Sequence, residues 1–158
     1  MIDITLALKL IHVLGAAVLF GTGLGIAFFM WMAHRTHDAA TIAATARIVV
    51  TADSIFTASA VIVQPFSGAL LAWTMGYRVS EPWLVTSLAL YVVVGLCWLP
   101  VVGIQIVLRN LAREAADTGT ELPARYHRLF RIWFLLGWPA FLGVIAIFAL
   151  MIWRPQLW

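Results

Sequence analysis

The sequence predicts an all-α protein in which four transmembrane helices form a bundle. The first observation behind this prediction is composition, because 63% of the 158 residues are hydrophobic and only 11% are charged. Soluble domains contain roughly 45–50% apolar and 25% charged residues, so this chain is too apolar for a soluble fold. The second observation is that the apolar residues are gathered into four long stretches with short polar connections between them.

Each apolar stretch is long enough to cross a bilayer as a helix. About 20 helical residues span the ~30 Å of hydrocarbon, and every stretch exceeds that length. The longest ones indicate tilting or extension beyond the lipid. No soluble domain fits in the remaining chain, so we expect a single integral membrane domain over residues 1–158. The predicted spans cover residues 4–33, 42–75, 83–108 and 132–153.

Arginines are distributed unequally between the two sides of the predicted bundle. Only two arginines, Arg78 and Arg154, lie near helix ends on the side that holds the second connection and the C-terminus, against seven on the opposite side. Because cytoplasmic loops are enriched in basic residues, we expect both termini to lie outside the cytoplasm. The basic residues flank apolar runs and form no stripe, which favours a lipid bilayer, and not a nucleic acid, as the partner. Seven arginines lie on the other side, in the first and third connections and at the start of the second span: Arg35, Arg47, Arg109, Arg113, Arg125, Arg128 and Arg131.

Tryptophans mark the expected ends of the spans. Trp31 and Trp133 are expected near one membrane surface, and Trp73, Trp83 and Trp153 near the other. Tryptophan is enriched at both interfaces between lipid and water. We therefore interpret all five as members of an aromatic belt.

The first span contains two ionisable side chains, Lys9 and His12, within the segment LKLIHVLGAAVLFGTGLG. A helix rises 1.5 Å per residue, so the two lie roughly 7–12 Å below the outer surface. Residues three apart share a helix face, and both side chains can therefore point the same way. Lys9 is close enough to the surface to extend its amine into water. His12 is too short to do so fully, and an ionisable residue within a span is a functional candidate by default.

Polar residues of the second and third spans are expected at the depth of His12. In the second span, Gln64 and Ser67 share a helical stripe with Asp53 and Thr57, and Pro65 is expected to free a carbonyl and kink the helix. An alternative is that Gln64 and Ser67 only form hydrogen bonds between helices. The prediction is one polar cluster in the outer third of the membrane: Lys9, His12, Gln64, Ser67 and Tyr91.

Glycines follow His12 along the first span. Gly15 lies one turn away, and Gly21 and Gly25 have the GxxxG spacing at which two helices pack closely. An alternative interpretation is that a flat cofactor lies against these glycines beside His12. Both interpretations stay open at this point.

Asp53 is the one acidic residue inside a predicted span. Arg47 lies six residues earlier, so the two side chains project about 120° apart and are poorly placed to pair. Asp53 therefore needs a hydroxyl group, an arginine from elsewhere or a proton. The sequence is compatible with a proton path and equally with a structural hydrogen bond.

Three histidines, His34, His37 and His127, are expected together on the arginine-rich side. Three imidazoles can bind a metal, but no carboxylate or cysteine accompanies them at a ligand spacing. This favours solvated histidines near the membrane surface. About 33 Å of helix separates His34 from His12, so the group forms a separate site.

The first span, LKLIHVLGAAVLFGTGLGIAFF, resembles that of a small bacterial membrane family, the predicted integral membrane proteins of domain of unknown function 2269. The resemblance extends over nearly the whole chain. The sequence is also distantly similar to the CopD copper-resistance proteins and to HemJ-type protoporphyrinogen oxidases, which share a K-x-x-H-V element matched by Lys9, His12 and Val13. The HemJ type also ends in an aromatic-rich span, matched here with Pro139 and Pro155.

These resemblances imply a multi-pass protein of the bacterial inner (cell) membrane that binds b-type haem through His12. The cofactor would lie beside the predicted polar cluster and Gly15. The segment LGWP departs from the Asn-Glu-x-Pro signature of the HemJ type. The resemblance therefore implies an architecture that can hold haem, with no commitment to porphyrinogen oxidation.

Three functions remain open. The first is a haem-binding redox protein, a membrane oxidoreductase if it is an enzyme, and a haem with two histidine ligands would need a homodimer or larger complex because each chain has one intramembrane histidine. The second is the handling of copper or another solute, although the methionines are scattered and Cys97 stands alone. The third is a helper subunit of a membrane complex without chemistry of its own.

Overall fold

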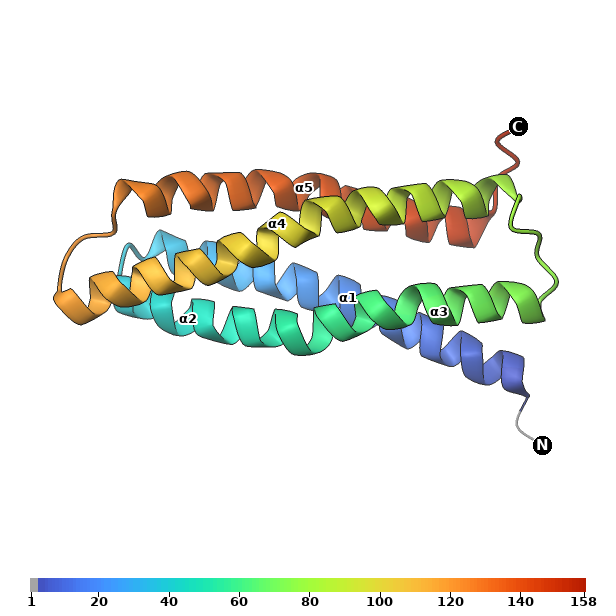
Figure 1. Cartoon of the computed structure of the whole chain (residues 1–158), viewed down its shortest axis with the longest axis horizontal. Helices are drawn as coiled ribbons and strands as arrows, with labels where there is room; N and C mark the ends of the chain where they lie inside the picture. Colours follow the sequence, from blue (N-terminus) through green and yellow to red (C-terminus); the bar gives the residue numbers. More distant parts are fainter. Residues whose placement is uncertain (1–2) are drawn as a thin grey trace.

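The computed structural model describes residues 3–158 and shows a bundle of four long antiparallel helices (Figure 1). All four are long and apolar enough to cross a membrane, which confirms the predicted fold class. The second of them contains a short π-helical turn, labelled η1, between two α-helical parts. The elements are α1 (Ile4–Arg35), α2 (Ala39–Ala52), η1 (Asp53–Thr57), α3 (Ala58–Thr74), α4 (Pro82–Thr118) and α5 (Ala124–Trp153).

The third connection is much shorter than the sequence suggested. Helix α4 continues ten residues beyond the predicted span to Thr118, and α5 begins at Ala124. The extension is helical because Ala112 and Ala115 are buried against the bundle. Gly119 ends α4 with a φ of 65°, a conformation that glycine adopts without steric cost. Five of the predicted loop arginines therefore lie on helices.

The connection between α1 and α2 is only three residues long. Asp38 caps α2 by accepting a hydrogen bond from the Thr41 backbone N–H at 2.8 Å. The hydrogen bonds from Thr41 hold the pKa of the Asp38 carboxyl below its usual range. Such a cap satisfies one of the backbone donors that a helix start leaves unpaired.

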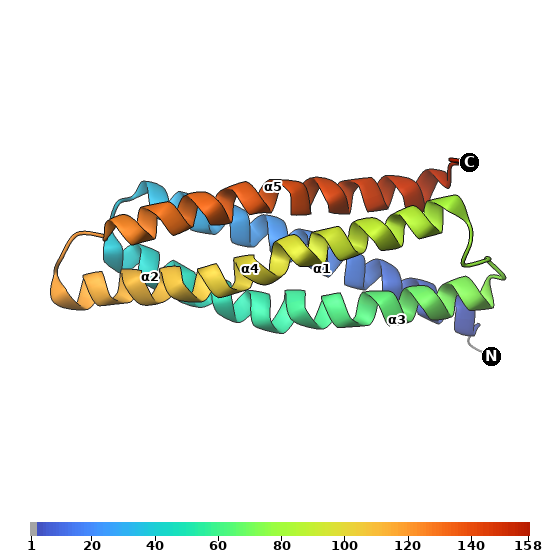
Figure 2. The same cartoon turned by 45° about the horizontal axis from the view of Figure 1, so that its top comes forward.

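The tightest packing lies toward the arginine-rich end, the end formed by the α1–α2 and α4–α5 connections. Fully buried side chains from four helices meet there, among them Met30, Ile42, Leu108 and Tyr126. Toward the other end, α1 runs away from α5 and stays beside α3 (Figures 1 and 2). The bundle is therefore closed at one end and more open at the other.

Two of the five predicted belt tryptophans are inside the bundle. Trp133 is 4% exposed and Trp83 is 7% exposed, so neither faces lipid. Trp83 lies beneath the Arg154 guanidinium, whose central carbon is 5.7 Å from the ring centroid. The belt interpretation is wrong for these two residues, because a span's hydropathy does not reveal which face of the helix is packed. Trp73 and Trp153 remain exposed.

Gly21 and Gly25 do not pack closely against another helix of this chain. A Cβ atom added at Gly21 meets nothing within 4 Å, and at Gly25 it meets only Phe29 of the same helix. Close approaches occur instead at Gly15 and Gly68, on the faces where α1 and α3 touch.

Candidate functional site

Three residues of the predicted polar cluster come together where α1 meets α3. The His12 Nδ1 atom lies 2.9 Å from Ser67 Oγ. The Gln64 amide nitrogen donates to the His12 backbone oxygen at 2.9 Å. Glycines allow this approach, because an added Cβ would lie 2.6 Å from Gln64 Nε2 at Gly15 and 3.0 Å from His12 Cε1 at Gly68. These three residues therefore lie at one level along the bundle, as the sequence predicted.

The hydrogen bonds assign the tautomer of His12. The Ser67 hydroxyl has one proton, which it donates to the Val63 carbonyl at 2.8 Å. His12 Nδ1 therefore carries the hydrogen of the contact with Ser67, and Nε2 keeps a free lone pair. Among residues 3–158, no hydrogen-bond partner of Nε2 is found.

Lys9 and Tyr91 do not join this group. Lys9 is exposed and makes no hydrogen bond or ion pair with the residues that the structure describes. Tyr91 donates its hydroxyl proton to the Val61 backbone oxygen. This is the carbonyl that Pro65 leaves without a helical partner, because proline has no N–H group. The expected freed carbonyl therefore exists, and Tyr91 satisfies it.

A cavity of about 550 Å³ lies between α1, α4, α5 and the second span. Gln64 and Tyr91 line it, whereas Lys9, His12, Gly15 and Ser67 do not. Its walls are mostly apolar and aromatic. Several lining side chains also reach the outer surface of the bundle, so the cavity opens sideways: Leu24 is 48%, Phe28 53% and Trp138 54% exposed.

A buried carboxyl group forms the polar end of this cavity. Asp53 is 4% exposed, and its Oδ1 atom accepts a hydrogen bond from Trp98 Nε1 at 3.3 Å. The Gln105 amide has one orientation that satisfies both of its neighbours. In it, the nitrogen donates to Asp53 Oδ2 at 3.2 Å and the oxygen accepts from Trp133 Nε1 at 3.2 Å. The second span, α4 and α5 are thereby joined through one acid.

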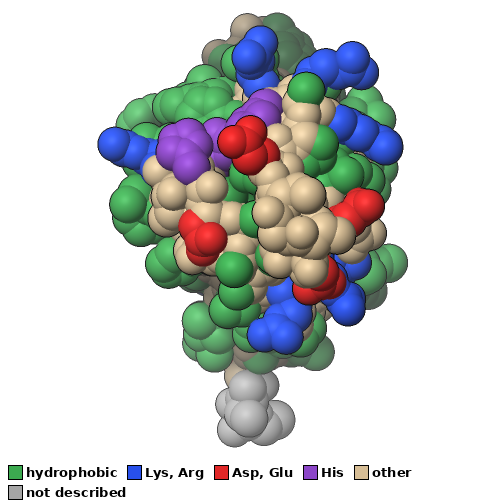
Figure 3. Space-filling model, turned by 90° about the vertical axis from the view of Figure 1, so that its left-hand side faces the viewer, with side chains coloured by type: hydrophobic (Ala, Val, Ile, Leu, Met, Phe, Trp, Pro, Cys, Tyr) green, Lys and Arg blue, Asp and Glu red, His purple; other side chains and the backbone are tan. Residues whose placement is uncertain are grey.

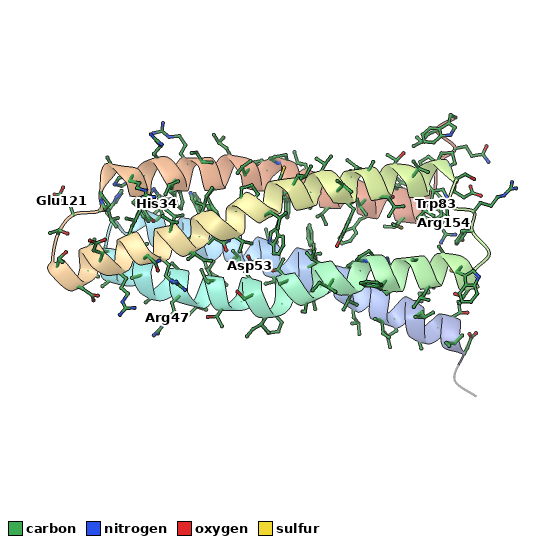
Figure 4. All side chains as sticks on the ribbon, in the orientation of Figure 1. His34, Arg47, Asp53, Trp83, Glu121 and Arg154 are labelled. Atoms are coloured by element: carbon green, nitrogen blue, oxygen red, sulfur yellow. The ribbon has the colours of Figure 1, made fainter. Side chains whose placement is uncertain are left out.

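Arg47 does not pair with Asp53, as the helical spacing predicted. Figure 4 shows Asp53 inside the bundle and Arg47 pointing away from it. Both donors to the carboxyl group, Trp98 and Gln105, are neutral. The carboxyl group therefore has hydrogen bonds but no counter-charge from these contacts.

Thr57 adds a second polar group at the same place. Its side chain is 4% exposed and lines the cavity, and its hydroxyl lies beside the Asp53 carboxyl group without a well-aligned hydrogen bond to it or to any other described residue. The buried hydroxyls of Ser67 and Ser87 instead donate to carbonyls four residues earlier. Thr57 ends the π-helical turn, in which the Asp53 carbonyl accepts from the Ala58 N–H, five residues on. Single π turns are frequent at functional sites.

The three other histidines lie together at the arginine-rich end, as predicted. The His34 ring stacks on Phe130 with centroids 3.7 Å apart, and Nδ1 lies 3.3 Å from the Tyr126 hydroxyl. The His37 and His127 rings are 6.2 Å and 5.9 Å from the His34 ring. Figure 3 shows histidines and acidic side chains on this end of the bundle, with basic side chains around it. Within residues 3–158, no group of histidine, cysteine or acidic residues is arranged to hold a metal ion.

The comparisons with known proteins agree with this architecture. Residues 6–155 match the family described as predicted integral membrane protein, domain of unknown function 2269. The chain belongs to this family. Membership confirms the resemblance noted in the first span and the integral membrane character of the protein. No curated protein and no solved structure matches the chain.

Sequence reasoning identified neither of the donors to Asp53, Trp98 and Gln105. Trp98 and Gln105 are seven residues apart and so share a face of α4, which is a detectable signal for a polar contact inside a span. Trp133 was assigned to the membrane surface, and its N–H group points into the bundle instead. The helical spacing of polar groups could therefore have identified the α4 residues, whereas nothing in the sequence indicated that Trp133 of α5 faces the bundle interior.

The polar network predicts different effects of two substitutions on stability. Gln105→Leu should lower the free energy of unfolding by about 1–3 kcal/mol for each polar atom left unpaired, here Asp53 Oδ2 and Trp133 Nε1. Thr57→Val should leave stability unchanged or slightly higher, because it breaks no hydrogen bond. Thermal unfolding of the purified variants in lipid nanodiscs measures both. Equal melting temperatures for Gln105→Leu and the wild type would contradict the network.

Proposed function

We propose that this protein binds a lipid-soluble small molecule in the central cavity. The main observation behind this proposal is that the cavity combines apolar and aromatic walls with one polar end at Asp53 and Thr57. Ligand sites are mostly apolar, and a few placed polar groups fix the orientation of the ligand. The unpartnered Thr57 hydroxyl supports a ligand, because an unpaired buried polar group is costly unless something bonds to it.

The sideways opening supports entry from the bilayer. The opening is bordered by large apolar side chains that line the cavity and are also exposed, among them Leu24 and Phe28 of α1 and Trp138 of α5. A polar solute would lose its hydration along such walls without replacement. A molecule already dissolved in lipid loses nothing there, so the geometry favours a lipophilic ligand.

Filling the cavity should displace this ligand. A Cβ atom added at Gly95, which lines the cavity, meets nothing within 4 Å, so Gly95→Leu places a side chain in the empty space. Gly103→Leu on the same helix is the matched control, because it also has open space but lies outside the cavity. Small molecules retained by the protein in native polymer-bounded membrane discs are measured by mass spectrometry.

The expected result is one compound enriched in the wild type and Gly103→Leu and reduced about tenfold in Gly95→Leu, the factor that 1.4 kcal/mol produces in a binding constant. A set of retained compounds identical in all three proteins would refute ligand binding in the cavity.

A second candidate function is haem-linked redox chemistry at His12. Its support is the tautomer, because ligating histidines usually donate the second ring nitrogen's hydrogen to a neighbour, as Nδ1 does to Ser67. His12 Nε2 would be the iron ligand. His12 does not line the cavity, and its ring packs against α3 at Gly68, so a porphyrin in the cavity would not reach His12. The haem would have to lie outside it, where a second copy of the chain can supply the other histidine. A bound haem would supply one-electron transfer.

An absorption spectrum tests this candidate. Protein produced with excess haem should show a Soret band that His12→Ala removes and His34→Ala retains, because only His12 offers an unpaired ring nitrogen inside the outer half of the bundle. A colourless wild-type preparation would rule the haem function out.

We also propose an orientation in a bacterial inner membrane, with the arginine-rich end in the cytoplasm. Cysteine labelling tests it in a Cys97→Ala background. Val79→Cys, in the connection at the other end, should react with a membrane-impermeant maleimide on intact cells, whereas Thr120→Cys should react only after lysis. The reverse pattern would place both termini in the cytoplasm.

A further inference from the structure

We propose that the cavity selects a lipophilic cation, whose positively charged group binds at Asp53 and Thr57. This inference rests on the proposed ligand function and adds the chemical class of the ligand. It is carried by the charges, the unpaired hydroxyl and the aromatic surface at the polar end of the cavity, taken together.

The first step is the charge inventory of the cavity. Asp53 is the only acidic or basic residue, among those described, that lines it. The carboxyl group is held by the N–H groups of Trp98 and Gln105, which carry no charge. The one salt bridge found in residues 3–158 joins Arg113 and Asp117 at the exposed surface. A carboxyl group held away from water either keeps its proton or pairs with a cation, and a cationic ligand supplies such a partner for the ionised form.

The second step is the Thr57 hydroxyl. It lines the same cavity at the end of the π turn that begins at Asp53, and its oxygen is buried without a well-aligned hydrogen bond. An ammonium group donates hydrogen bonds and accepts none. It can donate to the carboxylate of Asp53 and to the Thr57 oxygen together, which satisfies both groups without disturbing Trp98 or Gln105.

The third step is the aromatic surface around these groups. Trp98 and Trp133 lie at the polar end, and further rings continue along the walls, including Phe20, Trp138 and Phe141. The face of an aromatic ring attracts a cation and repels an anion. A phospholipid head group fits poorly, because its phosphate would need a basic residue and the described cavity lining contains none. The geometry therefore points to an amine or other organic cation on an apolar body.

Three compounds with one apolar cage and different polar groups test the charge preference. They are 1-adamantylamine, which is protonated at pH 7, 1-adamantanol, which is neutral, and 1-adamantanecarboxylate, which is an anion. Binding to the full-length protein in nanodiscs of zwitterionic lipid is measured by equilibrium dialysis, with empty nanodiscs as the background. We expect the ammonium compound to bind about tenfold or more tightly than the alcohol, and the carboxylate to bind most weakly.

Variants assign the preference to the proposed residues. Asp53→Asn, which keeps the size of the side chain, should bring the affinity for the ammonium compound down to that for the alcohol. Thr57→Val should weaken the ammonium compound by a smaller factor, and Gly95→Leu should weaken the amine and the alcohol alike. Gly103→Leu should bind all three compounds as the wild type does.

Equal binding of the amine and the alcohol by the wild type would overturn the cation inference, and so would an unchanged preference in Asp53→Asn. If Gly95→Leu still blocks both compounds, the cavity remains a ligand site and only the charge preference fails. If Asp53→Asn does not fold, the order in which the wild type binds the three compounds, and the weaker binding of the ammonium compound by Thr57→Val, test the cation inference. Failure of the proposed function shows separately, as retained compounds that do not change when the cavity is filled.

Discussion

The carboxyl group of Asp53 must find all its partners inside the protein, and this requirement organises the arginine-rich half of the bundle. Lipid offers no hydrogen bonds, so a polar group within a span is satisfied by other helices or by a bound molecule. Trp98 and Gln105 of α4 donate to Asp53, and Trp133 of α5 donates to Gln105 in turn. Three of the four transmembrane helices thereby have a fixed rotation relative to one another, which apolar packing alone would not specify.

The sequence predicted what depends on position along a helix. Span limits follow from local hydropathy, and the shared depth of His12, Gln64 and Ser67 follows from a fixed rise per residue. The carbonyl left free by Pro65, that of Val61, was predictable for the same reason, because a proline removes the hydrogen bond to the carbonyl four residues earlier.

What the sequence could not predict depends on the rotation of each helix about its axis. His12 was expected to face a pocket, but it faces α3. Of the predicted polar cluster, only Gln64 and Tyr91 line the cavity. Trp133 was placed at the membrane surface for the same reason. The π turn at Asp53 had no local signal, since its segment, DSIFT, contains neither glycine nor proline. Its position follows from the contacts of the second span with its neighbours.

Gln64 connects the two candidate sites. Its amide donates to the His12 backbone at the contact between α1 and α3, and the same side chain forms part of the cavity wall. The added Cβ at Gly15 would lie 2.6 Å from its amide nitrogen, so the side chain has little freedom on the α1 side. A ligand that pushes against Gln64 would therefore push against the backbone of α1 beside His12.

The ring of arginines at one end of the bundle has a consequence for the route of any charged molecule. Asp53 lies six residues, or about 9 Å of helix rise, beyond Arg47. A cation approaching from the water at that end would first meet a net positive charge, because seven arginines there outnumber the acidic residues Asp38, Glu114, Asp117 and Glu121 (Figure 3). One arriving from within the hydrocarbon would meet no like charge before the carboxylate. The fixed charges of this protein thus oppose the entry of a cation more strongly at one end of the bundle than at the other, and they make its two membrane surfaces unequal as points of entry.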